Sequence, residues 1–180
     1  NVNENATGVT VRAIYSYDGS SFDGTIELNN SLFQYTTAQR QYYIVSSVSG
    51  DKYGITVISV NDQTWCIWDQ IEVVSIITDF TYLDPSEYVR VQIYLRYDYD
   101  DSPVETGTFS LKYEDLTHIG DGVWEVNVTR LSYQTLSFDA LTTCDATIFG
   151  ITAFNMYNNE QVVYWDRLEI FESFSLDSRV

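Results

Sequence analysis

The sequence has few of the residues that metal sites, nucleophilic catalysis and disulfide frameworks require. Its 180 residues include one histidine, two cysteines and one methionine. A hydrolase triad needs an imidazole or an equivalent base beside its nucleophile, and no such pattern surrounds His118. One histidine and two distant cysteines also form no paired zinc motif. We therefore expect no catalytic residues, no enzymatic activity and no cofactor other than a bound cation.

Basic residues are equally scarce. Nine lysines and arginines stand against 26 aspartates and glutamates, which gives a net charge of −17. This charge repels phosphate backbones and anionic lipids, so we expect neither a nucleic acid partner nor membrane insertion. The apolar runs are far shorter than the roughly 20 residues that cross a bilayer. No basic and then apolar leader follows Asn1, as expected for a secreted protein whose signal peptide has been removed.

The residues that are present favour β-structure. Hydrophobic residues make up 44% of the chain, aromatic residues make up 16%, and there are 15 tyrosines. Short alternating runs are separated by Gly, Asp, Asn and Ser, and no helical stripe of useful length occurs. This spacing predicts an all-β fold of the immunoglobulin-like β-sandwich type.

Landmarks that recur in the same order indicate an internal duplication. The first pair is Tyr17-Asp18 with Tyr97-Asp98, each following an alternating run. The other pairs are Gly24 with Gly107, YGITVISV at 53–60 with FGITAFNM at 149–156, and Trp68-Asp69 with Trp165-Asp166. The resulting division is an N-terminal arm at 1–8, a first sandwich at 9–78, a junction at 79–86 and a second sandwich at 87–180.

The repeated Trp-Asp pair is best interpreted as architecture. A buried indole contributes a large apolar area and needs one hydrogen-bond acceptor, while an aspartate beside it can cap a strand end. We therefore expect Trp68 and Trp165 in two cores, with Asp69 and Asp166 as caps. Trp65 and Trp124 do not repeat, so they are the candidates for an interface or a sugar contact.

Three stretches together resemble a known class of repeat. These are Tyr17-Asp18-Gly19, VSSVSGDKYGIT at 45–56 and CIWDQIEV at 66–73. They resemble the tandem immunoglobulin-like repeats of prokaryotic, particularly archaeal, cell-surface proteins. The second copy departs from the pattern, because no glycine follows Tyr97-Asp98. The resemblance implies an extracellular structural component of the cell surface, such as a sheath, surface-layer or filament subunit.

Self-association is the function that these features favour. Exposed strand edges, only two lysines to guard them and a polar arm at 1–8 suit a protein that pairs with copies of itself. Divalent cations would reduce the repulsion between such acidic subunits. The alternative is a carbohydrate-binding or adhesion module, in which surface aromatic residues stack on glycans.

Further candidate sites remain open to two interpretations each. Asp98, Asp100 and Asp101 lie in one turn, which is either a calcium site or a solvated acidic loop. Cys66 and Cys144 break the repeat, since their counterparts are Val163 and Val48. They are either two buried thiols or a disulfide, formed between domains or between subunits.

Three sequons are compatible with secretion. We rank Asn127 first as a glycosylation site, because it faces solvent in an alternating strand, followed by Asn29 and Asn5.

Overall fold

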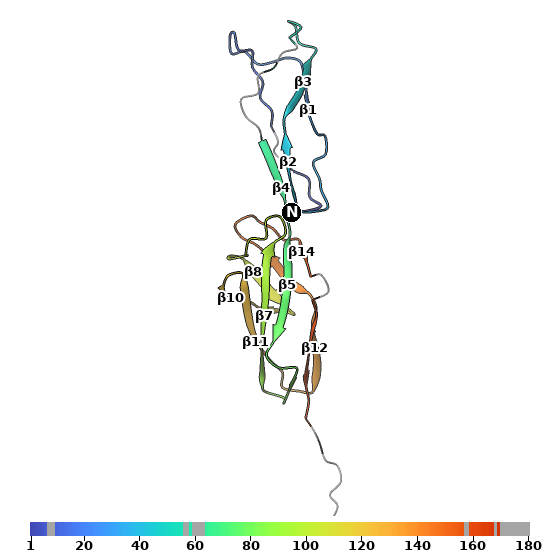
Figure 1. Ribbon diagram of the computed structural model, residues 1–180, viewed down its shortest axis with the longest axis vertical. Helices are drawn as coiled ribbons and strands as arrows, with labels where there is room; N and C mark the ends of the chain where they lie inside the picture. The colour runs from blue at the N-terminus through green and yellow to red at the C-terminus, as the bar shows by residue number, and fades with distance from the viewer. Residues whose placement is uncertain (7–9, 56–57, 59–63, 157–158, 168, 170–180) are drawn as a thin grey trace, which may run out of the picture.

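The chain folds as β-structure throughout the part that can be described. The computed structural model describes residues 1–6, 10–55, 58, 64–156, 159–167 and 169 (Figure 1). Strands occur in these residues and helices do not, which confirms the predicted all-β class. Accordingly, no helix that could cross a membrane is found among them.

The molecule is elongated and consists of two units placed end to end, with the N-terminus between them (Figure 1). We call the described residues up to Trp68 the N-terminal unit and those from Gln70 onward the C-terminal unit. Asp69 joins the two.

The N-terminal unit contains two antiparallel ribbons of two strands each. β1 (Thr25–Leu28) pairs with β3 (Val45–Ser49), and β2 (Gln39–Tyr43) pairs with β4 (Thr64–Trp68). The buried cluster of this unit is small and consists of Val2, Tyr43 and Trp68, with partly buried neighbours around it. Isolated two-stranded ribbons are marginally stable in water, so this unit depends on the contacts of its few buried side chains.

A five-stranded sheet forms one layer of the C-terminal unit, in the order β10-β11-β7-β5-β14. Its strands are β5 (Ile71–Thr78), β7 (Tyr88–Tyr97), β10 (Thr117–Gly120), β11 (Val123–Thr129) and β14 (Phe154–Asn155). β7 is central, pairing with β5 on one side and β11 on the other. Alternate residues of β7 are buried, so one face of the sheet turns toward the core.

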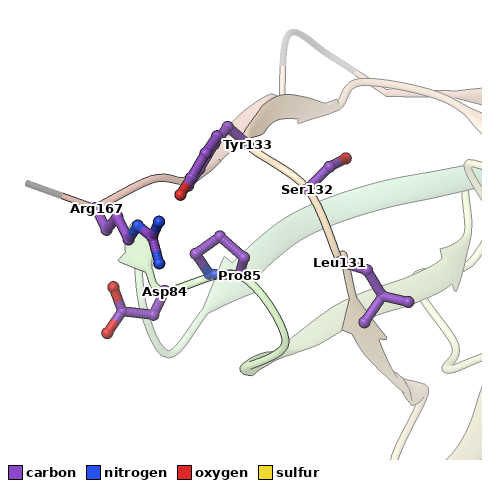
Figure 2. Close-up of a pocket in the computed structure, with 6 residues that line it drawn as sticks. All are labelled: Asp84, Pro85, Leu131, Ser132, Tyr133 and Arg167. Atoms are coloured by element: carbon purple, nitrogen blue, oxygen red, sulfur yellow. The ribbon is translucent and has the colours of Figure 1, made fainter. Parts of the chain in front are cut away.

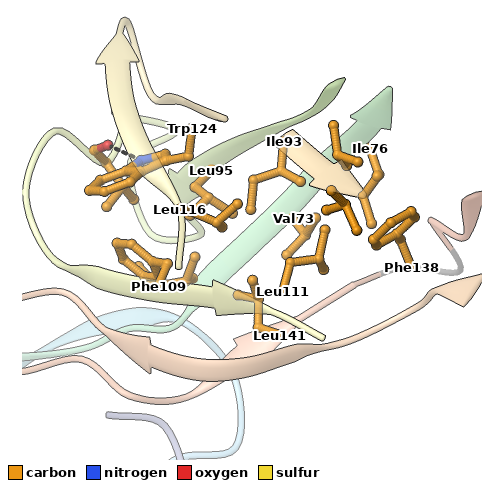
Figure 3. Packing of buried hydrophobic residues seen from close by; sticks show 14 of the residues in the cluster. Val73, Ile76, Ile93, Leu95, Phe109, Leu111, Leu116, Trp124, Phe138 and Leu141 are labelled. Atoms are coloured by element: carbon orange, nitrogen blue, oxygen red, sulfur yellow. Dashed lines mark hydrogen bonds between the residues drawn. The ribbon is translucent and has the colours of Figure 1, made fainter. Parts of the chain in front are cut away.

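Two three-stranded sheets complete this unit. One has the order β12-β15-β6, and the other has the order β13-β8-β9. Their strands are β6 (Tyr82–Leu83), β8 (Thr108–Leu111), β9 (Glu114–Asp115), β12 (Gln134–Phe138), β13 (Leu141–Asp145) and β15 (Gln161–Trp165). Ile93 of β7, Phe109 of β8 and Phe138 of β12 belong to one buried cluster, so the sheets pack face to face (Figure 3).

The boundary between the units differs from the predicted junction at 79–86. β5, which the prediction assigns to the first sandwich, lies in the C-terminal sheet between β7 and β14. The predicted junction contains β6, which pairs with β15 of the same unit. The chain passes from one unit to the other at Asp69, because the apolar side chains of β5 find their partners in β7.

The ribbons of the two units share the same strand registers. Thr25 pairs with Ser49 as Thr108 pairs with Asp145, and Leu28 pairs with Val45 as Leu111 pairs with Leu141. Both pairs of strands carry one register shift, at their Leu ends. β2 and β4 match β12 and β15 in the same way: Gln39 is opposite Trp68, and Gln134 is opposite Trp165.

Gly122 allows a direct test of the packing in the C-terminal unit. It has φ +72, and a Cβ atom there would lie 2.6 Å from the carbonyl oxygen of Leu95. Gly150 has a similar φ of +62, but a Cβ there meets nothing within 4 Å. We expect Gly150→Ala to lower the free energy of unfolding by about 1 kcal/mol through backbone strain alone. Gly122→Ala should cost clearly more, as measured by urea denaturation, and equal losses would contradict the packing described.

Candidate functional site: the junction and the free ends of the two units

Asp69 is the centre of the junction. Its side chain is only 7% exposed, and Oδ1 accepts hydrogen bonds from the backbone N–H groups of Gln70 (2.8 Å) and Tyr99 (2.9 Å). The Asp98 N–H donates to the Gln70 carbonyl oxygen (3.0 Å). Burial raises the pKa of the Asp69 carboxyl, and the two N–H donors act in the opposite direction. The carboxylate therefore fastens the turn after β7 to the end of the N-terminal unit.

The first residues of the chain also belong to the junction. The Asn1 Oδ1 atom accepts hydrogen bonds from the N–H groups of Thr152 (2.6 Å) and Ala153 (3.2 Å) in the C-terminal unit. Val2 is buried, and its N–H donates to the Asp69 carbonyl oxygen (3.0 Å). Residues 1–6 of the predicted arm at 1–8 make contacts within their own chain, while 7 and 8 lie outside the described residues; assembly through the arm stays a prediction.

Arg40 adds a contact that the sequence did not reveal. Its guanidinium lies 4.8 Å from the ring centre of Trp65 and 5.4 Å from that of Tyr99, so it links the two units. Trp65 remains 51% exposed, in keeping with its candidacy as a contact residue. The sequence shows an arginine and a tryptophan, which lie on the neighbouring strands β2 and β4. Predicting their contact also requires the register of these two strands, which the sequence does not give.

Trp124 is not an accessible aromatic residue, and its prediction as an interface or sugar contact is wrong. It is 4% exposed, its Nε1 donates to the Val104 carbonyl oxygen (2.9 Å), and its ring contacts Phe109 (Figure 3). It lies on β11, which has no matching strand among the described residues of the N-terminal unit. A residue without a counterpart in the repeat can still be part of a core.

The two Trp-Asp pairs occupy the same local structure. Trp68 and Trp165 are both buried and each ends a strand. Their indole N–H groups donate to the carbonyl oxygens of Glu4 (2.9 Å) and Glu87 (3.0 Å). Asp166 Oδ1 accepts the N–H of the following Arg167 at 2.8 Å, as Asp69 does with Gln70. Asp166 is exposed, however, and no second N–H reaches it within the described part of the chain.

The turn that Asp69 caps also has a counterpart. The Tyr97 N–H donates to the Ser102 carbonyl oxygen, and the Ser102 N–H donates to Asp100 Oδ1. At the far end of the N-terminal unit, Tyr15, Asp18 and Ser20 make the same two bonds: Tyr15 N–H to the Ser20 carbonyl oxygen, and Ser20 N–H to Asp18 Oδ1. Tyr17 thus matches Tyr99, and the predicted match of Tyr17-Asp18 with Tyr97-Asp98 is displaced by two residues.

Tyr17 is 99% exposed, and the N–H groups of Ser16 and Tyr17 have no hydrogen-bond acceptor among the described residues. The matching N–H groups of Asp98 and Tyr99 are both bonded at the junction. Each unit therefore has one end of each kind, and at the two outermost ends these groups have no second partner among the described residues.

The acidic turn does not gather its carboxylates around one point. Asp98 Oδ2 accepts a hydrogen bond from Gln70 Nε2 (2.7 Å), Asp100 caps Ser102, and Asp101 pairs with Arg96 Nη1 (3.1 Å). Among the residues that the structure describes, no group of three or more acidic, cysteine or histidine side chains is arranged to hold a metal ion. Calcium binding at Asp98, Asp100 and Asp101 stays a prediction without a converging ligand set.

Cys66 and Cys144 are free thiols, so the structure contains no disulfide between the units. Cys66 lies on β4 and packs against the N-terminal cluster, while Cys144 lies on β13 and packs against the C-terminal one. Their placement in separate cores explains why they do not meet. A link between subunits stays a prediction.

The three glycosylation candidates differ in how free their side chains are. Asn127 on β11 is exposed, as its alternating strand predicted. Asn29 is exposed too, but its amide donates to the Tyr42 carbonyl oxygen and accepts the Ile44 N–H. Asn5 is exposed and forms an isolated bridge with Gln34. Occupancy at these residues stays a prediction, and of the three only the Asn29 side chain makes hydrogen bonds among the described residues.

Comparisons with known proteins give no family for this chain. No family model, no curated protein and no solved structure matches it.

The role of Asp69 can be separated into hydrogen bonding and charge. We expect Asp69→Ala to lower the free energy of unfolding by about 1–3 kcal/mol, because two backbone N–H groups lose their acceptor. Asp69→Asn keeps an acceptor oxygen and should retain the stability of the parent protein at neutral pH. Urea denaturation measures both.

The pH dependence follows from the raised pKa of Asp69. A raised pKa means that the Asp69 carboxyl binds its proton more tightly in the folded than in the unfolded protein. This proton therefore stabilises the fold below pH 3.8, and the stabilisation is lost as the pH rises from 3.8 through the raised pKa. Asparagine does not titrate. As the pH rises across this interval, the free energy of unfolding of the parent protein should therefore fall relative to that of Asp69→Asn. A constant difference between the two proteins would show that Asp69 is not buried as described.

Cys144 should resist alkylation in the folded protein. Burial raises the pKa of its thiol from 9.0 to about 12. The thiolate fraction at pH 8 is therefore about a thousandfold smaller than for a thiol with the ordinary pKa. Mass spectrometry should find Cys144 unmodified by iodoacetamide in native buffer and modified in urea. Equal rates in both conditions would contradict its position in the core.

Proposed function

We propose that the chain is a non-enzymatic, extracellular structural protein that self-assembles at the cell surface, as a subunit of a sheath, surface layer or filament. We also propose that its two units are immunoglobulin-like β-sandwiches that arose by duplication. The observation that carries this proposal is the matched geometry of the two units. Their ribbons share strand registers, and their Trp-Asp ends and tip turns share hydrogen bonds.

The orientation of the two units supports a role in forming linear assemblies. In Figure 1, β1 and β3 lie above β2 and β4 in the N-terminal unit, and β8 likewise lies above β12, the strand that pairs with β15, in the C-terminal unit. Units that stack in one direction expose unlike ends at the two extremes. Contacts between unlike ends propagate into a linear assembly, whereas contacts between like ends close a dimer.

The N-terminal unit supports the same proposal through its incomplete burial. Ile26 and Leu28 of β1 are half-buried, whereas the matching Phe109 and Leu111 of β8 are buried beneath the five-stranded sheet. Large apolar side chains such as Leu32 and Trp65 are more than half exposed. A unit of this kind gains stability when another chain covers it.

Charge sets the conditions for assembly. A net charge of −17 opposes the approach of two copies, and this repulsion weakens as salt or divalent cations screen it. Assembly that increases with ionic strength is therefore the signature of this function.

Glycan binding is the second candidate function. The exposed ring of Trp65 with the Arg40 guanidinium beside it offers the aromatic and polar groups that sugar sites use. Trp124, the other tryptophan candidate, is buried, so of these two only Trp65 is accessible to a glycan.

Light scattering and electron microscopy of the purified protein, across a series of salt and calcium concentrations, test the proposed function. We expect particles to grow as salt or calcium is added, because screening lowers the repulsion between acidic subunits. Magnesium at equal ionic strength is the control that separates screening from calcium binding. A protein that stays monomeric in every condition would contradict self-assembly and leave glycan binding at Trp65 as the better function.

A further inference from the structure

The two outer ends of the molecule are complementary in part, because each repeats hydrogen bonds and turn geometry from one side of the internal junction. At that junction, the Trp68-Asp69 end of the N-terminal unit meets the turn Tyr97–Ser102 of the C-terminal unit. The free end of the C-terminal unit has the same Trp-Asp structure at Trp165 and Asp166. The free end of the N-terminal unit has the same turn at Tyr15–Ser20.

We propose that Asp166 of one copy docks onto the tip turn Ser16–Ser20 of a second copy, with its carboxylate accepting the Tyr17 N–H as Asp69 accepts the Tyr99 N–H. This rests on the proposed self-assembly and assigns it to the ends of the units. It differs from assembly through lateral strand edges or through the N-terminal arm, whose residues 1–6 are held within their own chain.

The turns match in conformation as well as in hydrogen bonding. Gly19 has φ 70 and Asp101 has φ 61, so both turns use the left-handed region at the same position. Isolated bridges close the two turns in the same way, between Ile14 and Ser21 and between Arg96 and Pro103. The Tyr17 N–H therefore projects from the same backbone geometry that presents the Tyr99 N–H to Asp69.

The acceptor side is also built in advance. The Arg167 N–H holds Asp166 Oδ1 at 2.8 Å, which orients the carboxylate as the Gln70 N–H orients that of Asp69. The first turn of each unit is repeated too: Asn3 (φ 64) and Ser86 (φ 80) precede Glu4 and Glu87, whose carbonyl oxygens accept the Trp indoles.

The end of the C-terminal unit offers room for an aromatic side chain. A hollow of about 550 Å³ opens there, lined by Asp84, Pro85, Leu131, Ser132, Tyr133 and Arg167 (Figure 2). The Arg167 guanidinium lies 5.5 Å from the Tyr133 ring centre, and Leu131 and Tyr133 are at least half exposed. The Tyr17 ring, which is almost completely exposed, can pack against the Arg167 guanidinium in this hollow.

The contact joins unlike surfaces, so each copy offers one end and accepts the other. Such a heterologous contact does not close a dimer and continues into a chain of copies. The internal junction forms at the high effective concentration of a covalent linkage, whereas the contact between copies does not. We therefore expect docking at high protein concentration or at raised salt.

Disulfide trapping tests the proposed contact without altering Asp166 or Tyr17. Beside the internal junction, and within the C-terminal unit, Gln70 Nε2 and Asp98 Oδ2 are 2.7 Å apart; the matching residues at the outer ends of the molecule are Arg167 and Ser16. In a background of Cys66→Ser and Cys144→Ala, the pair Gln70→Cys and Asp98→Cys should form a disulfide within one chain. The pair Ser16→Cys and Arg167→Cys should form a ladder of covalent oligomers on non-reducing gels.

Three controls make the ladder specific. Either cysteine of the Ser16/Arg167 pair alone should give no more than dimers. Ser16→Cys with Asn127→Cys, on the exposed side of β11, should give no ladder. Asp166→Ala in the trapping background should reduce the oligomers roughly tenfold, the effect of losing one acceptor worth about 1.4 kcal/mol, and Asp166→Asn should restore them.

The outcomes separate this contact from self-assembly in general. Particles seen by light scattering, together with an intact Gln70–Asp98 disulfide and no Ser16–Arg167 ladder, would overturn docking of the ends and leave self-assembly standing. Absence of both particles and ladder in every condition would overturn both. Failure of the Gln70–Asp98 pair to cross-link would overturn the junction geometry from which the contact is inferred.

Discussion

The buried carboxylate of Asp69 is the interaction on which the relation between the two units depends. It accepts one N–H from its own strand end and one from the turn of the next unit, so it fixes both the position and the direction of that turn. Taking a carboxylate out of water is unfavourable unless donors replace the lost hydration. The two backbone N–H groups replace part of that hydration, although burial still raises the pKa of the carboxyl, and their positions make the geometry of the junction specific.

The stability of the molecule is distributed unevenly around this junction. The C-terminal unit has a core drawn from three sheets, whereas the N-terminal unit buries Val2, Tyr15, Tyr43 and Trp68 among its described residues. Val2 is held by Asp69, and Asn1 by the C-terminal unit. The N-terminal unit therefore relies on the C-terminal unit, and its outer end carries the exposed Tyr17 turn. A unit built in this way is suited to a row of units more than to isolation.

The sequence was sufficient for the all-β class and for two core positions. Alternation predicted β-structure, and the repeated Trp-Asp pairs correctly placed Trp68 and Trp165 in two cores. The boundary could not be found in this way, because an apolar strand such as β5 does not encode which sheet it joins. Along the chain, β5 lies between the ribbon that ends at Trp68 and the strand β7, and it could pair with either. In the structure it pairs with β7, where its apolar side chains are buried.

The contacts at the junction could not be predicted from the sequence for a related reason. Tyr97-Asp98-Tyr99-Asp100 contains the same dipeptide twice, and only the hydrogen bonds of the turn show that Tyr99 matches Tyr17. The contact of Arg40 with Trp65 depends on the register of β2 and β4, which no local pattern gives. Trp124 is the opposite case. Because it has no counterpart in the repeat, the sequence predicts a contact residue, whereas in the structure it lies on β11 of the β10–β11 hairpin and belongs to the core.

Amide hydrogen exchange at Tyr99 and Tyr17 is the measurement that tests this account most directly. These two N–H groups occupy the same position in matching turns, and among the described residues of one molecule only that of Tyr99 has an acceptor. The account predicts slow exchange at Tyr99 at every concentration, fast exchange at Tyr17 in dilute protein, and slowing at Tyr17 as copies associate. Fast exchange at Tyr99, or a Tyr17 rate unchanged by association, would contradict it.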